Sequence, residues 1–349
     1  MQDIVLLFPG ALVLLFMARK VARRVGLVDK PNARKHHKGS IPLVGGVSIY
    51  FSIWLLFGLQ PGWLPEFPAY MCCITLLLIV GGLDDRFDLP VLPRVLLQVG
   101  VAGIMMLQGL YLSSLGNVLF GYPLVLGAAG YMVTVFAVIG AINAFNMVDG
   151  IDGLLGSLSC VTLGALGIVF WLGGSNNIAK WCLSLMAACL PYILLNLGIP
   201  WGKKFKVFMG DAGSMLIGFT VIWLLIVASQ GPEAVMWPVT ALWLIAVPLM
   251  DMIRVMMARV KKGCSPFRPD REHFHHILLR CGFSAHISLF IPTVLSIALA
   301  MIGIFIEKLN VSSSISFFLI LIIFYLYLKI INLLSKISAA KNDNISMTV

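Results

Sequence analysis

The sequence predicts an all-α fold, that of a polytopic integral membrane protein with about 11 transmembrane helices. Of its 349 residues, 60% are hydrophobic and only 11% are charged, and the mean hydropathy is +0.97. Soluble globular domains carry about 25% charged residues, so this composition excludes that class. Apolar runs also recur along the chain at lengths close to the roughly 20 residues that cross a bilayer.

Apolar runs define the expected helices. They lie near residues 4–18, 41–60, 69–83, 91–112, 126–145, 155–172, 181–198, 213–229, 237–256, 287–306 and 314–332. Asp3 precedes the first run, and Arg19 and Lys20 follow it, which is the reverse of the charge order in a cleavable signal peptide. We therefore expect the first run to be retained as a helix. An odd number of spans places the two termini on opposite sides of the membrane.

Basic residues indicate the orientation, because Lys and Arg accumulate in cytoplasmic loops. With the N-terminus periplasmic and the C-terminus cytoplasmic, only Lys180 and Lys308 fall outside. We expect one transmembrane catalytic domain, residues 1–334, followed by a disordered cytoplasmic tail, 335–349. Its cytoplasmic loops are expected at 19–40, 84–90, 146–154, 199–212 and 259–286. The net charge of +10 lies in these loops beside the spans, which favours the lipid bilayer, and not nucleic acid, as the partner.

Most carboxylates gather on the same cytoplasmic side, and the first group is GGLDDRFD at 81–88. Asp85 and Asp88 are three residues apart and Asp84 and Asp88 are four apart, so on a helix they can share a face. Such a group attracts cations. The alternative is a solvated helix end with Arg86 as the counter-ion.

The second group is NAFNMVDGIDGL at 143–154. At the bilayer centre Asp149 and Asp152 would together cost about 5 to 7 kcal/mol, so they must lie at an interface or in a wet cavity. Oxygen ligands from Asn146 and these aspartates, beside flexible glycine, suit a hard cation such as Mg2+ shared with substrate phosphates. The alternative is a polar helix cap punctuated by glycines.

The third group is KKFKVFMGDAGS at 203–214. A helix N-terminus with small residues presents backbone N–H groups to an anion, and Asp211 can hold a metal. Lys206 and its neighbouring lysines raise the local potential. Topology-determining lysines followed by an N-capping aspartate explain the pattern about as well.

The longest inside loop, KKGCSPFRPDREHFHHILLRCG at 261–282, carries histidines and arginines. These residue types bind phosphate through charge-assisted hydrogen bonds. The candidates are His273, His275, His276, Arg268, Arg271 and Arg280. One alternative is a zinc site with Cys264 and Cys281, whose spacing fits no familiar zinc pattern, and another is a solvated basic loop.

Two further features are weaker. The first inside loop, LVDKPNARKHHKGSIPLVGG at 27–46, contains Arg34 and His37, and by itself it indicates topology only. Asp251 lies in the ninth run with Arg254 one turn later, a spacing that favours a buried ion pair over a catalyst.

Carboxylates for a divalent cation and cationic loops for phosphates, gathered at one membrane face, favour phosphoryl transfer, where catalysis is mainly positioning and charge neutralisation. A transporter is the rival class, because intramembrane carboxylates are also typical of ion pathways. Transport, however, predicts acids at mid-span with access from both sides. A non-catalytic scaffold leaves the ordered acidic motifs without a purpose.

Four motifs, GGLDDRFD, NAFNMVDGIDGL, FMGDAGS and HFHHILLRCGF, occur in that order between hydrophobic runs. Through them the chain closely resembles the polyprenyl-phosphate N-acetylhexosamine-1-phosphate transferase family over about residues 19–286, and RKHHKGSIPLVGG fits as well. The transferases of phospho-MurNAc-pentapeptide in this family share the acidic motifs but have a different histidine loop. The resemblance therefore favours a UDP-GlcNAc enzyme.

The resemblance implies transfer of GlcNAc-1-phosphate from UDP-GlcNAc to undecaprenyl phosphate, with release of UMP and with Mg2+, or Mn2+ in its place, as cofactor. It also implies the bacterial inner membrane, a site on the cytoplasmic face, and the first step of O-antigen or enterobacterial common antigen synthesis. Another UDP-N-acetylhexosamine or UDP-MurNAc-pentapeptide stays as the alternative donor. A homodimer is left open.

Residue roles follow from the matched motifs. The resemblance implies catalytic roles for Asp84, Asp85, Asp149 and Asp152. It implies metal binding by Asp211, Asn146, Asp84 and Asp85. Substrate binding is expected of His273, His275, His276, Arg271, Arg268, Lys206, Asp88, Arg34 and His37.

Two mechanisms stay open: attack by an aspartate to form a phosphoenzyme, or direct attack by the lipid phosphate on the β-phosphorus of the donor. The acceptor is a phosphate monoester whose second pKa is near 6, so it is mostly a dianion at cytosolic pH. It needs little help from a base, and this favours direct attack.

Overall fold

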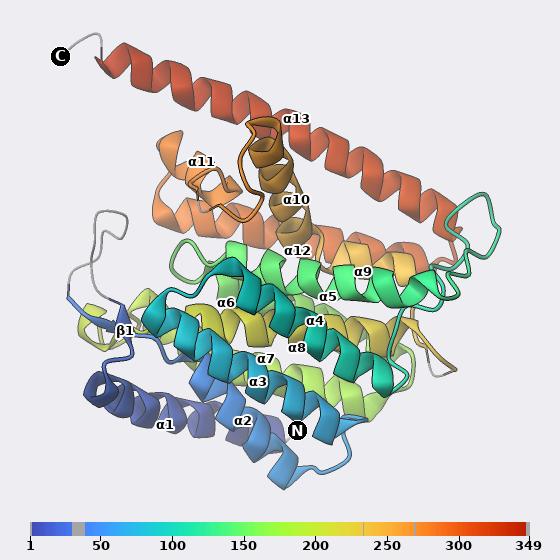
Figure 1. Cartoon of the computed structure of the whole chain (residues 1–349), viewed down its shortest axis with the longest axis horizontal. Coiled ribbons are helices and arrows are strands. Elements are labelled where there is room, and N and C mark those ends of the chain that lie inside the picture. Colours follow the sequence, from blue (N-terminus) through green and yellow to red (C-terminus); the bar gives the residue numbers. More distant parts are fainter. Residues whose placement is uncertain (1, 30–38, 233, 269, 347–349) are drawn as a thin grey trace.

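The structure, a computed structural model, describes residues 2–29, 39–232, 234–268 and 270–346 and is almost entirely helical (Figure 1). The helices are α1 Gln2–Val25, α2 Gly45–Leu59, α3 Phe67–Phe87, α4 Val91–Leu107, α5 Ala129–Met147, α6 Leu154–Leu172, α7 Asn176–Leu197, α8 Gly210–Ser229, α9 Pro238–Leu244, α10 Ala246–Lys261, α11 Phe274–Arg280, α12 Ala285–Lys308 and α13 Ser313–Ser346. A single 3-10 turn, Lys203–Phe205, precedes α8.

In the described ranges, 7 helices are long and apolar enough to cross a membrane, and α9 with α10 makes an eighth candidate. Helices α2 and α4 are shorter and apolar. Each predicted apolar run lies on a helix or, in the ninth case, on the pair α9 and α10. The all-α, polytopic membrane fold is thereby confirmed, while the exact number of spans and the sides of the termini stay predictions.

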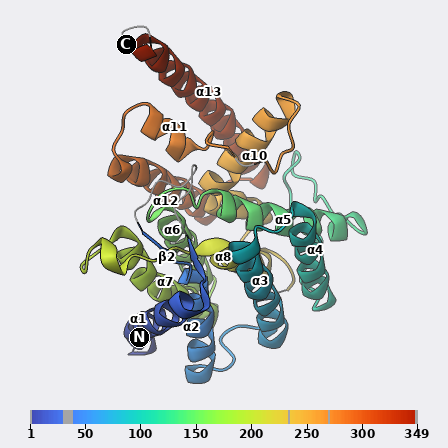
Figure 2. The same ribbon diagram turned by 60° about the vertical axis from the view of Figure 1, so that its left-hand side comes forward.

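The ninth predicted span, 237–256, is not one straight helix. The axes of α9 and α10 differ by 81°, and α10 leaves the direction of the bundle in both views (Figures 1 and 2). Pro248 has no N–H to give to the carbonyl of Leu244, so the helical hydrogen bonding fails there. The hydroxyl of Thr162 donates to that carbonyl instead, at 3.2 Å, so the carbonyl of Leu244 still has a hydrogen-bond partner.

Helix α8 is the central helix of the bundle. Of its apolar window, 94% is buried, and it packs against α2, α3, α5 and α6. Its sequence is apolar on all sides, as expected for a helix with no solvent-facing stripe. The polar beginning of α8, at Gly210 and Asp211, is consequently surrounded by the ends of its neighbours.

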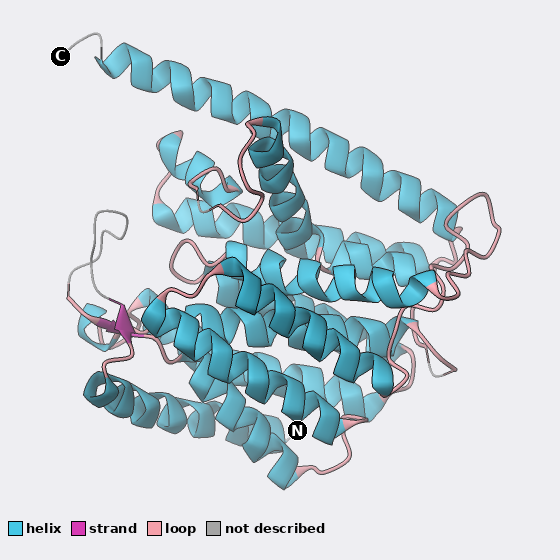
Figure 3. Ribbon diagram, in the orientation of Figure 1, coloured by secondary structure: helices cyan, strands magenta, loops and turns pink. Residues whose placement is uncertain are grey.

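The backbone before α8 is tied to the end of the first inside loop. Strands β1 Val28–Asp29 and β2 Ile41–Pro42 form a two-stranded antiparallel sheet (Figure 3). Just after β2, the N–H groups of Val44 and Gly45 donate to the carbonyl of Phe208, at 3.1 and 3.0 Å. The described residues 41–46 and the segment 203–214 are therefore neighbours.

The last helix extends beyond the expected span. Helix α13 continues to Ser346, so residues 335–346, expected to be disordered, are helical in the structure. The reason is local, because no proline or glycine occurs between 313 and 346 and extending a helix already formed adds one hydrogen bond for each residue fixed.

Candidate active site

The carboxylate of Asp85 lies at the N-terminus of α8. Its Oδ1 accepts a hydrogen bond from the backbone N–H of Asp211 at 2.7 Å, and its Oδ2 accepts one from Ala212 at 3.2 Å. These N–H groups have no partner inside their own helix, and the positive end of the helix dipole favours a negative charge there. The first and third acidic motifs, at the end of α3 and the start of α8, are thereby joined.

Asn146 joins the second motif to the same point. Its side-chain amide, at the end of α5, donates to Oδ1 of Asp211 at 2.6 Å and to the hydroxyl of Ser214 at 2.8 Å. Asn146 therefore holds the Asp211 carboxylate by one oxygen. The ends of α3 and α5 and the beginning of α8 meet there, as the sequence predicts.

Asp84 faces a different partner from its neighbour Asp85. Its side chain is buried, its Oδ2 pairs with the guanidinium of Arg94 at 2.7 Å, and its Oδ1 accepts from the N–H of Leu89 at 2.8 Å. Both oxygens are thus engaged, one by the turn after α3 and one by the first turn of α4. Sequence reasoning missed Arg94, for which the only signal is a single cation in the first turn of an apolar helix.

The loop after α5 is held against the segment before α8. Asp152 forms an ion pair with Lys206, with 2.5 Å between Oδ2 and Nζ. The buried side chain of Asn196, at the end of α7, accepts from the N–H of Gly153 at 2.5 Å and donates to the carbonyl of Val207 at 2.8 Å. Sequence reasoning missed Asn196 as well, although a lone amide near the end of an apolar run requires partners once buried.

The histidine motif packs directly on the second acidic motif. The imidazole of His275 is buried and lies against Gly150, where a Cβ would overlap its Nε2. The rings of His273 and His275 are stacked, with centroids 5.8 Å apart and planes 9° apart. The ring centroids of His275 and His276 are 4.2 Å apart. The three histidines therefore form one row, and its middle ring, His275, lies on the backbone between Asp149 and Asp152.

Two of the three histidines are uncharged at cytosolic pH. Burial, more than the neighbouring His276 and His273, lowers the pKa of His275 well below its ordinary value. Burial, followed by the charge of His273, lowers the pKa of His276 to about 4. These rings can give and accept hydrogen bonds to a sugar or a phosphate, but they do not supply the positive charge that the sequence suggested.

Other predicted substrate-binding residues are exposed or lie outside the described residues. Arg268 and Arg271 are exposed on the loop before α11, and Asp88 is exposed at the end of α3. One guanidinium nitrogen of Arg268 lies 3.4 Å from the Sγ of Cys264. Arg34 and His37 lie outside the described residues.

Within the described parts of the chain, no group of three or more His, Cys, Asp or Glu side chains is arranged to enclose a metal ion. Mg2+ does not require such a cage, since it is usually held by one or two carboxylates together with substrate phosphates. Asp211, oriented by Asn146 and next to the carboxylate of Asp85, offers this kind of donor set.

Replacement of Gly150 by alanine is expected to lower activity strongly, by about 100-fold, because a displacement of about 1 Å in a positioned group can cost that much. The new Cβ would overlap the His275 ring and push the histidine row away from the second acidic motif. Turnover by purified protein in detergent measures the effect. Gly140→Ala is the matched control, since a Cβ there meets only the tip of Met252, at 3.9 Å. Full activity of Gly150→Ala would contradict the packing described here.

Comparisons with known proteins identify relatives of this chain. Residues 67–229, which contain all three acidic motifs, match the family described as glycosyl transferase family 4. The chain is 51% identical over 327 residues to the undecaprenyl-phosphate alpha-N-acetylglucosaminyl 1-phosphate transferase of Escherichia coli K12, covering 93% of this chain and 89% of the relative. Proteins of the same name from Yersinia pestis and Haemophilus influenzae are 51% and 46% identical, over 88% and 94% of this chain and 84% and 92% of their own.

Proposed function

The chain belongs to glycosyl transferase family 4, and from that membership we propose that it transfers GlcNAc-1-phosphate from UDP-GlcNAc to undecaprenyl phosphate. The products are undecaprenyl-pyrophosphoryl-GlcNAc and UMP. The relatives that share this name align with nearly the whole chain, from the first helix to the last. The observation that carries the proposal is the meeting of Asp85, Asn146 and Asp211 at the start of α8, beside the histidine row.

We propose that Mg2+ is the cofactor, held by Asp211 with Asn146 orienting its carboxylate and Asp85 adjacent. When bound, such an ion neutralises the phosphate charge that develops during transfer and aligns donor with acceptor. Asp85 can share in holding the ion because its carboxylate is fixed at the N-terminus of α8, next to Asp211. Asp84, whose charge is balanced by Arg94, supports the end of α3.

The acceptor phosphate needs positioning more than deprotonation. A phosphate monoester is largely a dianion at neutral pH, so direct attack on the β-phosphorus of the donor requires no strong base. Neither Asp149 nor Asp152 is then needed as a base, and the Asp152–Lys206 pair keeps a cation close to the anionic substrates. The neutral, partly exposed ring of His276 contributes hydrogen bonds to the sugar or phosphates.

The site is proposed to open on the cytoplasmic face of the bacterial inner membrane, where the reaction begins a lipid-linked glycan. Support comes from the basic residues at this end of the bundle. Lys203, Lys204 and Lys206 precede α8, and Arg19 of α1 donates to the carbonyl of Lys204 and stacks over Phe205. Such a concentration of Lys and Arg beside helix ends is typical of cytoplasmic loops.

Release of UMP by the purified protein tests the function. We expect UMP only when UDP-GlcNAc and undecaprenyl phosphate are both present, and a lipid product that carries GlcNAc and two phosphates. UDP-GalNAc and UDP-MurNAc-pentapeptide, tested in parallel, are expected to give much less product. Absence of lipid product from UDP-GlcNAc would refute the proposal. A stoichiometric burst of UMP without the lipid would instead refute direct attack and favour a phosphoenzyme.

A further inference from the structure

Asp251, in the middle of α10, receives hydrogen bonds from the histidine motif at the start of α11 and from α13. Its Oδ2 lies 2.8 Å from Nδ1 of His273, and its Oδ1 accepts from the N–H of Phe274 at 3.0 Å and from the hydroxyl of Tyr327 on α13 at 3.2 Å. Arg254 completes the surroundings, with a guanidinium nitrogen 3.5 Å from Oδ1. The three side chains that contact Asp251, those of His273, Tyr327 and Arg254, are all buried.

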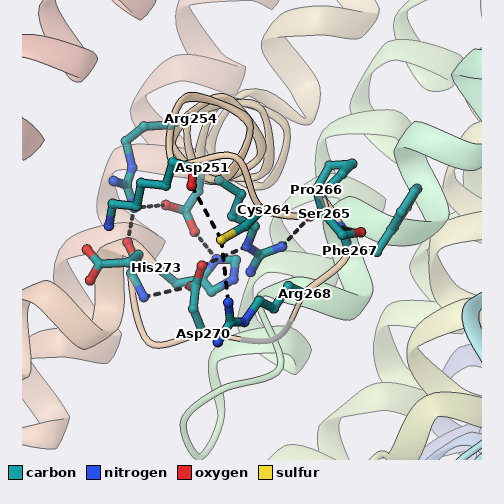
Figure 4. Close-up of polar contacts among 12 residues, drawn as sticks. Asp251, Arg254, Cys264, Ser265, Pro266, Phe267, Arg268, Asp270 and His273 are labelled. Atoms are coloured by element: carbon teal, nitrogen blue, oxygen red, sulfur yellow. Dashed lines mark hydrogen bonds and ion pairs between the residues drawn. The ribbon is translucent and has the colours of Figure 1, made fainter.

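Figure 4 shows that α10 holds the segment before the histidine motif at further points. Arg254 also donates to the carbonyl of Glu272. Arg259 donates to the carboxylate of Asp270 at 2.7 Å and to the carbonyl of Pro266 at 2.6 Å. These contacts fix where the backbone of the loop runs. The contact of Asp251 with an imidazole nitrogen is different in kind, because it also determines where a hydrogen sits.

A carboxylate can only accept a hydrogen bond, so the partner nitrogen Nδ1 of His273 must carry the hydrogen. The second ring nitrogen, Nε2, is then the one left for a substrate. The stacking of His273 on His275, which itself lies on Gly150, places the ring one layer from the second acidic motif. The bend between α9 and α10 brings Asp251 to this position.

We propose that Asp251 is a positioning residue for GlcNAc-1-phosphate transfer: it holds His273 by Nδ1, in the tautomer and orientation that present Nε2 to the phosphates of the sugar nucleotide. The inference rests on the proposed function. It assigns a specific role to a residue whose spacing from Arg254 indicated only a buried ion pair.

The test is Asp251→Asn, which preserves shape. In this variant the N–H of Phe274 and the hydroxyl of Tyr327 still donate to the side-chain oxygen, which fixes the orientation of the amide. The amide nitrogen then faces Nδ1 of His273. Because that nitrogen can only donate, Nδ1 must accept and the ring hydrogen must move to Nε2. We expect kcat to fall about 10- to 100-fold, as for other partners that orient a functional histidine, with the KM for UDP-GlcNAc changed less than about threefold. Tyr327→Phe is the matched control, because it removes a donor to the same carboxylate and leaves His273 paired; it should retain wild-type kcat.

Protein labelled with 15N in its histidine rings reports the tautomer of His273. That tautomer would not change in Asp251→Asn if the role of Asp251 were purely structural. The wild type is expected to show the Nδ1–H form for His273, assigned by comparison with His273→Gln, and Asp251→Asn is expected to show the Nε2–H form. The inference is overturned if wild-type His273 carries its hydrogen on Nε2, if Asp251→Asn turns over normally, or if Tyr327→Phe loses as much activity as Asp251→Asn. Failure of the wild type to form lipid product would refute the proposed function instead.

Discussion

Asp211→Asn is expected to lower GlcNAc-1-phosphate transfer by about 100- to 1000-fold, the range for loss of a group that stabilises transferring charge, and to abolish the response to Mg2+. The substitution keeps the size of the side chain and the contact of its oxygen with Asn146. It leaves the capping of α8 intact, because Asp85 accepts from the backbone N–H of residue 211 and not from its side chain. What it removes is the negative charge at the point where α3, α5 and α8 meet.

A titration of activity with Mg2+ in the purified wild type and variant measures this effect. Ser214→Ala is the control, since it removes the other acceptor of the Asn146 amide without altering any charge, and we expect activity within about threefold of wild type because a single neutral hydrogen bond contributes only about 0.5 to 1.5 kcal/mol. Unchanged melting temperatures in detergent would show that both variants fold. Normal turnover of Asp211→Asn would remove Asp211 from the metal site.

The sequence was sufficient to predict that distant acidic segments meet at one end of a helical bundle. The reason is energetic, because carboxylates and lysines cannot stay in hydrocarbon without partners, and each acidic motif adjoins the end of an apolar run. Asp85 and Asn146 accordingly both contact Asp211. The helical runs were predictable for the same reason, since only helices satisfy the backbone inside a bilayer without a closed barrel.

The partner of each aspartate could not be predicted from the sequence. Adjacent residues on a helix point about 100° apart, so Asp84 faces Arg94 on α4 while Asp85 faces α8. Which of the two meets the site depends on the rotation of α3, which tertiary packing decides. The contacts of Asp251 with His273 and Tyr327 join segments 22 and 76 residues away along the chain, and no local pattern reports them.

The charge state of the histidine motif depends on burial, which composition does not reveal. A loop rich in Arg and His suggested cationic phosphate binding, yet packing against Gly150 buries His275 and lowers its pKa. The bend at Ile245 was only partly predictable from the sequence. Pro248 was visible in the sequence, but a proline inside an apolar run can either kink a helix or be tolerated near its start, and only the structure distinguishes these outcomes.

Gly81→Ala and Gly82→Ala form a pair of adjacent substitutions with opposite expected results. A Cβ at Gly81 would overlap the backbone of Ala212 at the start of α8, whereas a Cβ at Gly82 has nothing within 4 Å. Gly81→Ala must therefore separate α3 from α8. Overpacking of this kind costs about 1 to 3 kcal/mol, and moving the Asp85 carboxylate by even about 1 Å from the N–H of Asp211 should lower kcat about 100-fold.

Gly82→Ala makes the same chemical change one residue later and should keep full activity. Alanine is the better helix former, so its melting temperature should equal or exceed that of the wild type, by an amount that reflects about 0.4 to 1 kcal/mol. Turnover and thermal unfolding in the same detergent measure both variants. Because the two sites share one helix and one flanking sequence, a loss confined to Gly81→Ala isolates the contact between α3 and the start of α8. Equal losses in both would mean that glycine flexibility in α3, and not close approach to Ala212, is what the site requires.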